Sequence, residues 1–358
     1  MDGPLVIAAK LPTFSGMLPR ISTLSLLFLS AAAAATAADF KVLSHYPIPG
    51  DVRYDYLRVD PDMRRLYVSH GNKVDVLDVD TGATLGEVSP MKGVHGIAIV
   101  PALKRGFITS GGDRTVVMFD VTTLKVLKVI TGLGMKPDAI EYDPETQKVY
   151  VANGQSGGIT VIDPASGEIT ATVPIEGKLE GLAFDGKGRL FVNTEDKSMI
   201  QVVDTHTLKP LAAWPIAPVE GGTGLAIDPV THRLFSAGGN GKLAVVNSDT
   251  GALVATPEIG EDPDGDAFDA TNGYIFTSSV LGTLTILHED SPDAYSLVQT
   301  VTTARGARTI TLDARTGRVF VATGKFGDAP APTADNPHPR PQAQPGTFEV
   351  LAVGRQAP

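Results

Sequence analysis

Ionisable side chains recur at a nearly constant spacing along the sequence, each at the start of a short repeated segment. The first copy of the segment is Asp55-Tyr-Leu-Arg-Val-Asp-Pro61, and it returns six times in altered form at intervals of 40 to 44 residues. The residues at its first position are Asp55, His95, Asp138, Glu180, Thr223, Asp264 and Arg308. If the segments lie side by side, these seven side chains gather around one cavity. Convergent ionisable groups of this kind are typical of a ligand-binding or ion-binding site.

Part of this set has the chemistry of a metal site. Carboxylate oxygens suit hard divalent cations, and an imidazole favours a transition metal. The residues that we predict as metal ligands are His95, Asp138, Glu180 and Asp264. A structural interpretation stays open, in which the same side chains bond backbone amides and join neighbouring repeats. Arg308 would then neutralise Asp264 or Asp266.

One further carboxylate stands where the other repeats are aliphatic. Two positions after the first residue of the segment, six repeats carry Leu or Ile, at Leu57, Ile97, Ile140, Leu182, Leu225 and Ile310. The sixth repeat carries Asp266 instead, and Glu261 and Asp262 precede it closely. We therefore add Asp266 to the candidate ligand-binding residues.

The elements that would position these residues are short strands. Each repeat contains four runs of β-branched and aromatic residues bounded by Gly, Pro, Asn or Asp, as in Lys148-Val-Tyr-Val151 and Ile159-Thr-Val-Ile-Asp163. Seven repeats of four strands predict an all-β protein with a single seven-bladed β-propeller of antiparallel blades. The first strand of each blade lines the central channel, so the seven recurring residues form a ring at one mouth of it.

The two ends of the chain predict how the ring closes. The seventh repeat has strands at 309–312, 319–323 and 348–353 and then ends one strand short. A spare strand is present before the first repeat, at 40–47. Pairing the N-terminal strand with the last blade completes that blade and removes its open edge.

The third repeat resembles a known family. Lys148-Val-Tyr-Val-Ala-Asn153, Gly158-Ile-Thr-Val-Ile-Asp-Pro164 and Ser166-Gly-Glu-Ile-Thr-Ala-Thr-Val173 are similar to the YVTN repeat of YncE-like bacterial β-propellers. The resemblance extends over residues 39–358 and implies a propeller of exported or surface-layer type. The family has no agreed catalytic residues, so the resemblance implies no reaction.

An insertion interrupts the seventh repeat between its second and third strands, at 326–347. It contains six prolines together with His338 and Arg340. Loops of this length in a compact domain are either functional or disordered. We expect it beside the channel mouth, either as a lid or partner-docking arm or as a solvated, extended segment.

Residues 1–38 have the layout of a signal peptide. Arg20 precedes an apolar run at 21–35, and Ala35-Thr36-Ala37 provides a small-residue cleavage site. We therefore expect a periplasmic or extracellular protein with no transmembrane span in the mature chain. The mature chain has 28 basic and 39 acidic residues, a formal charge of −11. Because nucleic-acid binding needs clustered Lys and Arg, we expect no nucleic-acid partner.

Composition excludes several cofactors. The chain has no Cys, which excludes disulfides, thiolate chemistry and the Cys-x-x-Cys-His haem attachment motif. Trp214 is the only Trp, whereas propellers that bind the quinone cofactor PQQ usually carry a Trp in each repeat. We expect neither haem nor PQQ, and a divalent metal ion remains a candidate.

These observations predict a monomeric binding protein. We expect it to hold a small ligand, an ion or an envelope protein at the channel face without catalysis. The first alternative is a metal-dependent hydrolase of lactonase or esterase type, in which carboxylates of the ring hold a cation that activates water. The second is a structural protein of the cell envelope.

Overall fold

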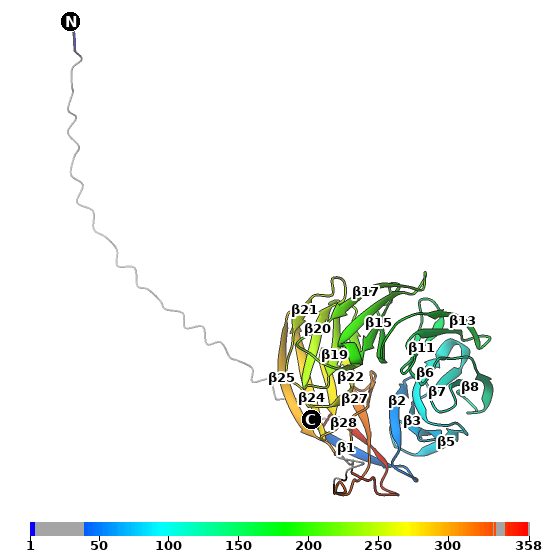
Figure 1. Cartoon of the computed structure of the whole chain (residues 1–358). Helices are drawn as coiled ribbons and strands as arrows, with labels where there is room; N and C mark the ends of the chain where they lie inside the picture. The colour runs from blue at the N-terminus through cyan, green and yellow to red at the C-terminus, as the bar shows by residue number, and fades with distance from the viewer. Residues whose placement is uncertain (4–38, 332, 334–340, 357–358) are drawn as a thin grey trace. The chain divides into compact units, whose positions relative to one another are not determined.

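The strands form seven separate antiparallel sheets of four strands each, arranged as blades around a circle (Figure 1). In this computed structural model the described residues are 1–3, 39–331, 333 and 341–356. The predicted all-β, seven-bladed propeller is therefore confirmed. The predicted signal peptide lies, except for residues 1–3, outside the described residues. The described part of the chain contains no helix with the length and hydropathy needed to span a membrane.

The first strand of each blade contacts the first strands of both neighbouring blades, which makes an inner ring. These strands are β2 (Tyr54–Asp60), β6 (Val94–Val100), β10 (Pro137–Asp143), β14 (Leu179–Phe184), β18 (Gly222–Asp228), β22 (Pro263–Asp269) and β26 (Ile310–Asp313). Contact between β26 and β2 closes the circle.

The second and third strands of each blade are almost completely buried, because neighbouring blades cover both faces of the sheet. This is why they have nearly continuous apolar sequences instead of alternating ones. The second strands are β3 (Arg65–His70), β7 (Arg105–Ser110), β11 (Lys148–Asn153), β15 (Arg189–Thr194), β19 (Arg233–Gly238), β23 (Tyr274–Ser279) and β27 (Arg318–Thr323). The third strands are β4 (Lys73–Asp78), β8 (Thr115–Asp120), β12 (Ile159–Asp163), β16 (Met199–Asp204), β20 (Lys242–Asn247), β24 (Thr283–Ser291) and β28 (Glu349–Arg355).

The fourth strands lie at the outside and are partly exposed. In β13 the exposed and half-buried residues alternate, as expected for an edge strand with one solvated face. The fourth strands are β5 (Thr84–Val88), β9 (Val126–Ile130), β13 (Glu168–Val173), β17 (Lys209–Pro215), β21 (Leu253–Ala255), β25 (Ala294–Thr302) and β1 (Phe40–Pro47). Two short 3-10 helices, η1 (Pro101–Leu103) and η2 (Glu195–Lys197), complete the described elements.

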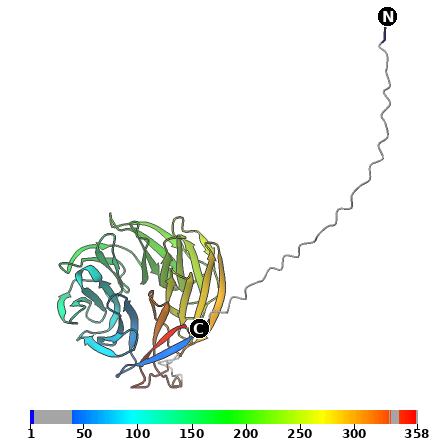
Figure 2. The ribbon, with the colours of Figure 1, turned by 180° about the vertical axis from the view of Figure 1, so that it is seen from behind.

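The last blade is assembled from both ends of the propeller. Strand β1 pairs antiparallel with β28, with Phe40 opposite Arg355 and Pro47 opposite Glu349. Figure 2 shows the blue N-terminal strand beside the red C-terminal one. The predicted closure is confirmed, and it gives the last blade four strands, as in the other six blades.

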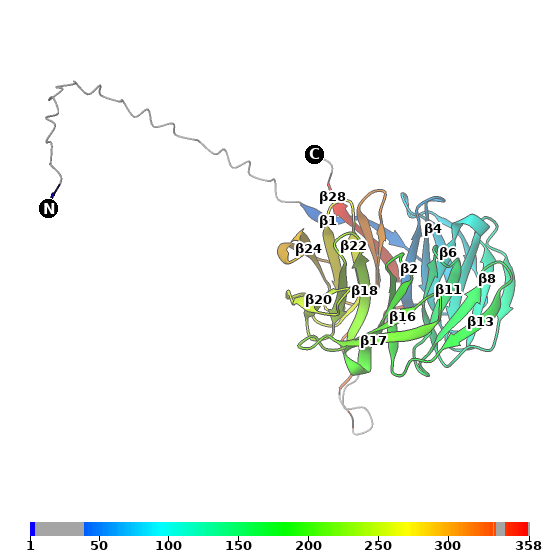
Figure 3. The ribbon, with the colours of Figure 1, turned by 90° about the horizontal axis from the view of Figure 1, so that it is seen from above.

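The insertion leaves the ring after β27, on the face where the first strands begin. Its base is paired: Phe326 bridges to Ala343, the Gly327 N–H donates to the Gln342 carbonyl at 2.9 Å, and the Phe326 and Ala343 side chains pack against the core of blades one and seven. Figure 3 shows the blades from the side, with the strands of each blade running between the two faces of the propeller. Its prolines and charged residues at 334–340, including His338 and Arg340, lie outside the described residues.

Candidate functional site

The seven recurring residues, called here the rim residues, all lie at the same end of the inner ring. Six of them are in the first half of a first strand, and Arg308 lies two residues before β26. The structure nevertheless divides them into two groups. Asp55, His95 and Asp138 contact one another, whereas Thr223, Asp264 and Arg308 line a cavity. Glu180 lies between the two groups in the order of blades.

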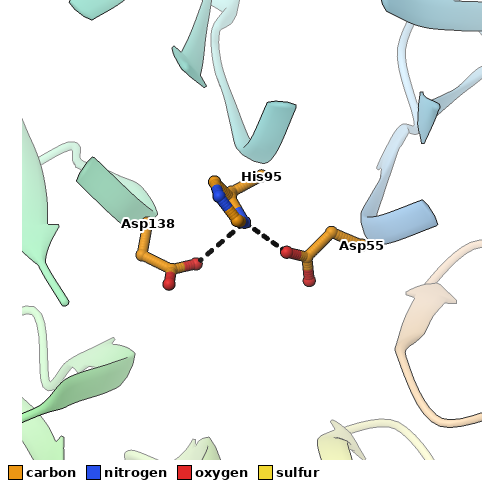
Figure 4. A group of neighbouring side chains, drawn as sticks. All are labelled: Asp55, His95 and Asp138. Carbon is orange, nitrogen blue, oxygen red and sulfur yellow. Dashed lines mark hydrogen bonds and ion pairs between the residues drawn. The ribbon is translucent and has the colours of Figure 1, made fainter. Parts of the chain in front are cut away.

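The first group, called here the His95 cluster, consists of Asp55, His95 and Asp138 from blades one, two and three. The Nδ1 atom of His95 is hydrogen-bonded to Asp55 Oδ2 and lies 3.5 Å from Asp138 Oδ1 (Figure 4). Lys136 Nζ lies 2.7 Å from the other oxygen of Asp138. The two carboxylates of the cluster are therefore paired with the basic groups of His95 and Lys136.

Burial and charge both act on the titration of this cluster. Burial, reinforced by the charge of Asp55, raises the pKa of Asp138, and His95 and Lys136 offset only part of that rise. Burial lowers the pKa of His95, but the hydrogen bond to Asp55 and the neighbouring carboxylates outweigh burial, so this pKa is raised overall. The cluster thus favours a protonated His95 held between two acidic groups.

Glu180 has its own basic partner. Lys178 Nζ lies 3.1 Å from Glu180 Oε1 and also contacts Glu195 in the following 3-10 helix. Burial, followed by the charge of Asp138, raises the pKa of Glu180 to about 8. Lys178 offsets only part of this rise in the pKa of Glu180.

The second group of rim residues opens into a cavity of about 720 Å³, called here the mouth cavity. Thr223, Asp264 and Arg308 form part of its lining. Arg308 Nε lies 3.2 Å from Asp264 Oδ2, and the Thr223 hydroxyl donates to the Pro263 carbonyl at 3.0 Å. Burial raises the pKa of Asp264 to about 6, and Arg308 lowers it in part.

The wall of the mouth cavity combines aromatic and charged side chains. Tyr54 and two residues of the insertion, Phe326 and Pro341, lie in it. The insertion was predicted beside the channel mouth, and these two of its described residues line the mouth cavity. Further charged residues in the lining are Arg53, Lys178, Glu195, Asp262 and Arg305.

Asp266, which we added to the candidate ligand-binding residues, does not line the mouth cavity with the rim residues but lies deeper in the channel. Its backbone contributes to the inner ring, while both carboxylate oxygens are buried and lack a hydrogen bond of normal geometry. Burial raises its pKa well above the usual value, and nearby backbone amides of Ala237 and of Asp266 itself offset this only in part. The equivalent aliphatic residues of other blades, such as Leu57 and Ile97, belong to core clusters. Asp266 thus places a carboxylate at a position that is aliphatic in the other blades, inside the channel and not at its rim.

A second cavity, of about 260 Å³, lies deeper in the channel and is lined by the first strands of all seven blades. Tyr56 borders it. The Tyr56 ring packs against the core cluster that contains Ala139 and Leu182, so this residue of blade one reaches toward blades three and four. Burial, followed by the charges of Asp138 and Glu180, raises the pKa of Tyr56 well above its usual value.

Tyr56 was missed in the sequence, although the repeats carried a signal. The equivalent residues are all small: Gly96, Ala139, Gly181, Gly224, Gly265 and Thr309. The first strands approach closely here, so that a Cβ atom on Gly96 would lie 2.7 Å from the Asp138 carbonyl oxygen. A large aromatic residue at this position is therefore an exception that the alignment of repeats could have revealed.

A half-buried ion pair deeper in the channel was also missed, although it too departs from the repeat. Arg58 contacts Glu141 across blade two, and Arg58 Nε donates to the Ile97 carbonyl at 3.0 Å. Burial raises the pKa of Glu141, against the effect of Arg58. The other repeats have only Ala or Thr at this position, at Ala98, Ala183, Ala226, Ala267 and Thr311.

The predicted metal ligands are not all brought together. Among the described residues, the group that could hold one ion is Asp55, His95 and Asp138, whose ligand atoms lie within 4.8 Å of one another. Two carboxylates and an imidazole suit a transition metal. Glu180 and Asp264 are instead paired with Lys178 and Arg308. A cation at the His95 cluster would have to replace the hydrogen bond between His95 Nδ1 and Asp55 and compete with Lys136 for Asp138.

The fold and the channel define the class of protein as a seven-bladed β-propeller. No protein-family model matches the sequence, and no curated protein matches it. Solved structures do match the fold. The chain is similar to hydrazine synthase of Kuenenia stuttgartiensis, with 18% identity and a TM-score of 0.66 over 76% of this chain and 92% of that chain.

Two further similar structures are U3-55K and the WD40 repeats of RRP9. Both are 12% identical to this chain and cover 89% of it, with TM-scores of 0.73 and 0.74 and with 99% and 98% of their own chains covered. At these identities the likeness concerns the propeller fold alone.

Proposed function

We propose that the protein is an exported, YVTN-type β-propeller that binds a small ligand in the mouth cavity. The observation that carries this proposal is the mouth cavity itself. Its volume of about 720 Å³ falls within the range of about 300–1,000 Å³ usual for small-molecule sites. Its lining combines ionisable rim residues with aromatic side chains, which would orient a ligand and bury its apolar part.

The position of the cavity supports binding at this face in particular. Arg308 and Asp264 belong to rigid strands or their immediate connections, and Tyr54 is fixed by a hydrogen bond from its hydroxyl to the Gly306 carbonyl at 2.5 Å. Phe326 comes from the insertion, whose base packs against the core. A binding wall held in this way is preorganised, which lowers the entropic cost of binding.

Export and family membership are the parts of the proposal that the sequence alone supports. The evidence for export is the arrangement of Arg20, the apolar run at 21–35 and the small residues before Ala38. Cell fractionation with mass spectrometry of the mature N-terminus tests it. A chain that begins near Ala38 in the periplasm or medium is the expected result, and a cytoplasmic chain that retains Met1 or Met17 contradicts it.

Blocking the cavity tests the binding function. A compound library is screened by ligand-detected NMR against the mature protein, the variant Thr223→Trp and the control Thr172→Trp. Thr223 lines the mouth cavity, whereas Thr172 is exposed on the outer strand β13. Ligands that bind the mature protein and the control but not Thr223→Trp support the proposal. Ligands that bind all three proteins equally place binding elsewhere, and no ligand for the folded protein favours the structural role.

The second candidate function is a metal-dependent hydrolase centred on the His95 cluster. The observation in its favour is that ligand atoms of Asp55, His95 and Asp138 lie within 4.8 Å of one another. A metal ion held there would polarise a carbonyl group and lower the pKa of a water molecule. Elemental analysis combined with lactonase and esterase assays decides this. Metal and turnover that are both lost in Asp138→Ala support the hydrolase, and metal-free protein without turnover contradicts it.

A further inference from the structure

The lining of the mouth cavity has a different charge balance from the rest of the chain. The whole chain has a formal charge of −10. The mouth cavity has four basic residues in its lining, Arg53, Lys178, Arg305 and Arg308, against three acidic ones, Glu195, Asp262 and Asp264. An acidic protein that gathers basic side chains in one cavity provides a local site for an anion.

Two of these basic side chains, Arg305 and Arg308, keep N–H donors free for a ligand. Lys178 is occupied by Glu180 and Glu195. Arg308, in contrast, has a single ion pair, to Asp264 at 3.2 Å through Nε, and its side chain is 38% exposed. In the described part of the chain, its terminal NH groups have no hydrogen bond, and Arg305 has no ion pair. A planar guanidinium is suited to bidentate contact with a carboxylate through Nε and one terminal NH group, and at Arg308 this contact forms once Asp264 leaves Nε.

An aromatic wall stands next to these guanidinium groups. Gly306 lies between Arg305 and Arg308 in sequence, and a Cβ atom on it would meet both the Phe326 ring and the Tyr54 hydroxyl at 2.6 Å. The Tyr54 ring is stacked on Phe348 with a centroid separation of 5.6 Å. An apolar ring or chain attached to an anionic group would therefore find a fixed surface within reach of Arg308.

We propose that the mouth cavity binds a small organic carboxylate, which takes the place of the Asp264 carboxylate on the Arg308 guanidinium. This inference rests on the proposed binding function and specifies its ligand class. Asp264 acts as an internal competitor that holds Arg308 in position when no ligand is bound. The apolar part of the ligand packs against Tyr54 and Phe326.

The test is a set of calorimetric titrations of the mature protein with four probes. Benzoate carries the carboxylate and a ring, acetate the carboxylate alone, benzylamine the ring with the opposite charge, and inorganic phosphate a different oxyanion. We expect benzoate to bind at least about tenfold more tightly than acetate, because burial of the ring adds apolar contact. Benzylamine and phosphate should bind more weakly than benzoate.

Variants locate the interaction. Arg308→Met should weaken benzoate binding at least about tenfold, and Arg308→Lys, which keeps the charge without the fork, should weaken it about as much. Asp264→Asn should strengthen binding at least about fivefold, because it removes the competitor and keeps the shape. Asp262→Asn is the matched control. It removes the same charge from the same lining, but Asp262 has no ion pair in the described part of the chain, so we expect less than about a twofold change.

Each outcome supports or overturns the inference. Loss of benzoate binding in both Arg308 variants, together with tighter binding in Asp264→Asn alone, supports it. Equal effects of Asp264→Asn and Asp262→Asn overturn the competition between Asp264 and the ligand. Tighter binding of phosphate, or binding of benzylamine at the cavity, overturns the carboxylate class and leaves the proposed binding function intact. Failure of every probe and of the compound library overturns both.

Discussion

The two groups of rim residues begin from the same place in the repeat and end in different environments. In blades one to three, His95 is hydrogen-bonded to Asp55 and forms an ion pair with Asp138. In blades five to seven, Thr223, Asp264 and Arg308 face the mouth cavity. The difference teaches that a ring of ionisable residues is not one site: part of it stabilises the propeller, and part of it is available to a ligand.

Removal of the His95 imidazole should have the largest effect on stability, because it breaks the contacts that hold the His95 cluster together. His95→Ala leaves the buried Asp138 and the half-buried Asp55 without their shared partner. We expect the free energy of unfolding to fall by about 3 kcal/mol, measured by urea denaturation. His45→Ala is the control: His45 also contacts a carboxylate, Glu349, but its side chain is 62% exposed. It should change stability by less than about 0.5 kcal/mol, and equal losses in the two variants would contradict the account.

The deeper ion pair should show the same dependence on a shared partner. Arg58→Ala leaves Glu141 without its cation, and we expect a loss of about 2 kcal/mol. The double variant with Glu141→Ala has at both positions the small residue found in other blades, so most of the loss should be recovered. Urea denaturation of the single and double variants measures the coupling. If the loss in the double variant equals the sum of the losses in the two single variants, Arg58 and Glu141 are not energetically coupled.

In blade six, one substitution should increase the stability of the protein. Asp266→Leu places the residue of the other blades in a core position whose carboxylate lacks a normal hydrogen bond. We expect a gain of about 1–2 kcal/mol at pH 7, measured as an increase in the free energy of unfolding. Asp266→Asn, which keeps the polar group without the titration, is the matched control and should gain less.

The gain should depend on pH in a defined direction. The folded-state pKa of Asp266 is raised by burial, so the folded protein keeps a proton that the unfolded chain releases above about pH 4. The stability of the natural protein should therefore fall as pH rises from about 4 toward the folded pKa. Asp266→Leu removes this contribution, whereas those of Glu180 and Asp264 remain. A difference between the two proteins that shrinks with rising pH would contradict this assignment.

The smallest effect is expected at the hydroxyl group of Tyr56. The ring fills space in the channel, but among the described residues the hydroxyl has no hydrogen-bond partner. Tyr56→Phe should therefore change the free energy of unfolding by less than about 0.5 kcal/mol, while Tyr56→Ala, which also removes the ring, should cost more. Thermal denaturation of the two variants compares them. A large loss in Tyr56→Phe would show that the hydroxyl is part of the His95 cluster.

The sequence predicted the fold almost completely because repetition itself carries the information. Asp60, Asp143 and Asp228 end first strands in the same way, and each accepts backbone N–H groups of the following turn. The same local reason acts in each of these repeats, so it is visible in the sequence. Closure by residues 40–47 followed from a count of strands.

The site was less predictable because it depends on departures from the repeat. Whether a rim residue meets a neighbour or a cavity depends on side-chain length and on partners such as Lys136 and Lys178, which precede the compared segment. Tyr56 and Asp266 each differ from six equivalents and both border the deeper cavity. The Tyr56 ring packs against blades three and four, whereas the Asp266 carboxylate is buried without a hydrogen bond of normal geometry. Period and spacing identify such exceptions, but only the packing of adjacent blades determines their contacts.

The most direct test of the account is a calorimetric titration of benzoate at pH 7 into two variants, His95→Gln and Arg308→Met. Each replaces the basic residue of one half of the rim. The account predicts that His95→Gln binds benzoate as the natural protein does, within about twofold, and that Arg308→Met loses binding at least about tenfold. Loss of binding in His95→Gln with retention in Arg308→Met would place the ligand at the His95 cluster. That result would contradict the claim that the ligand binds at Arg308 in the mouth cavity.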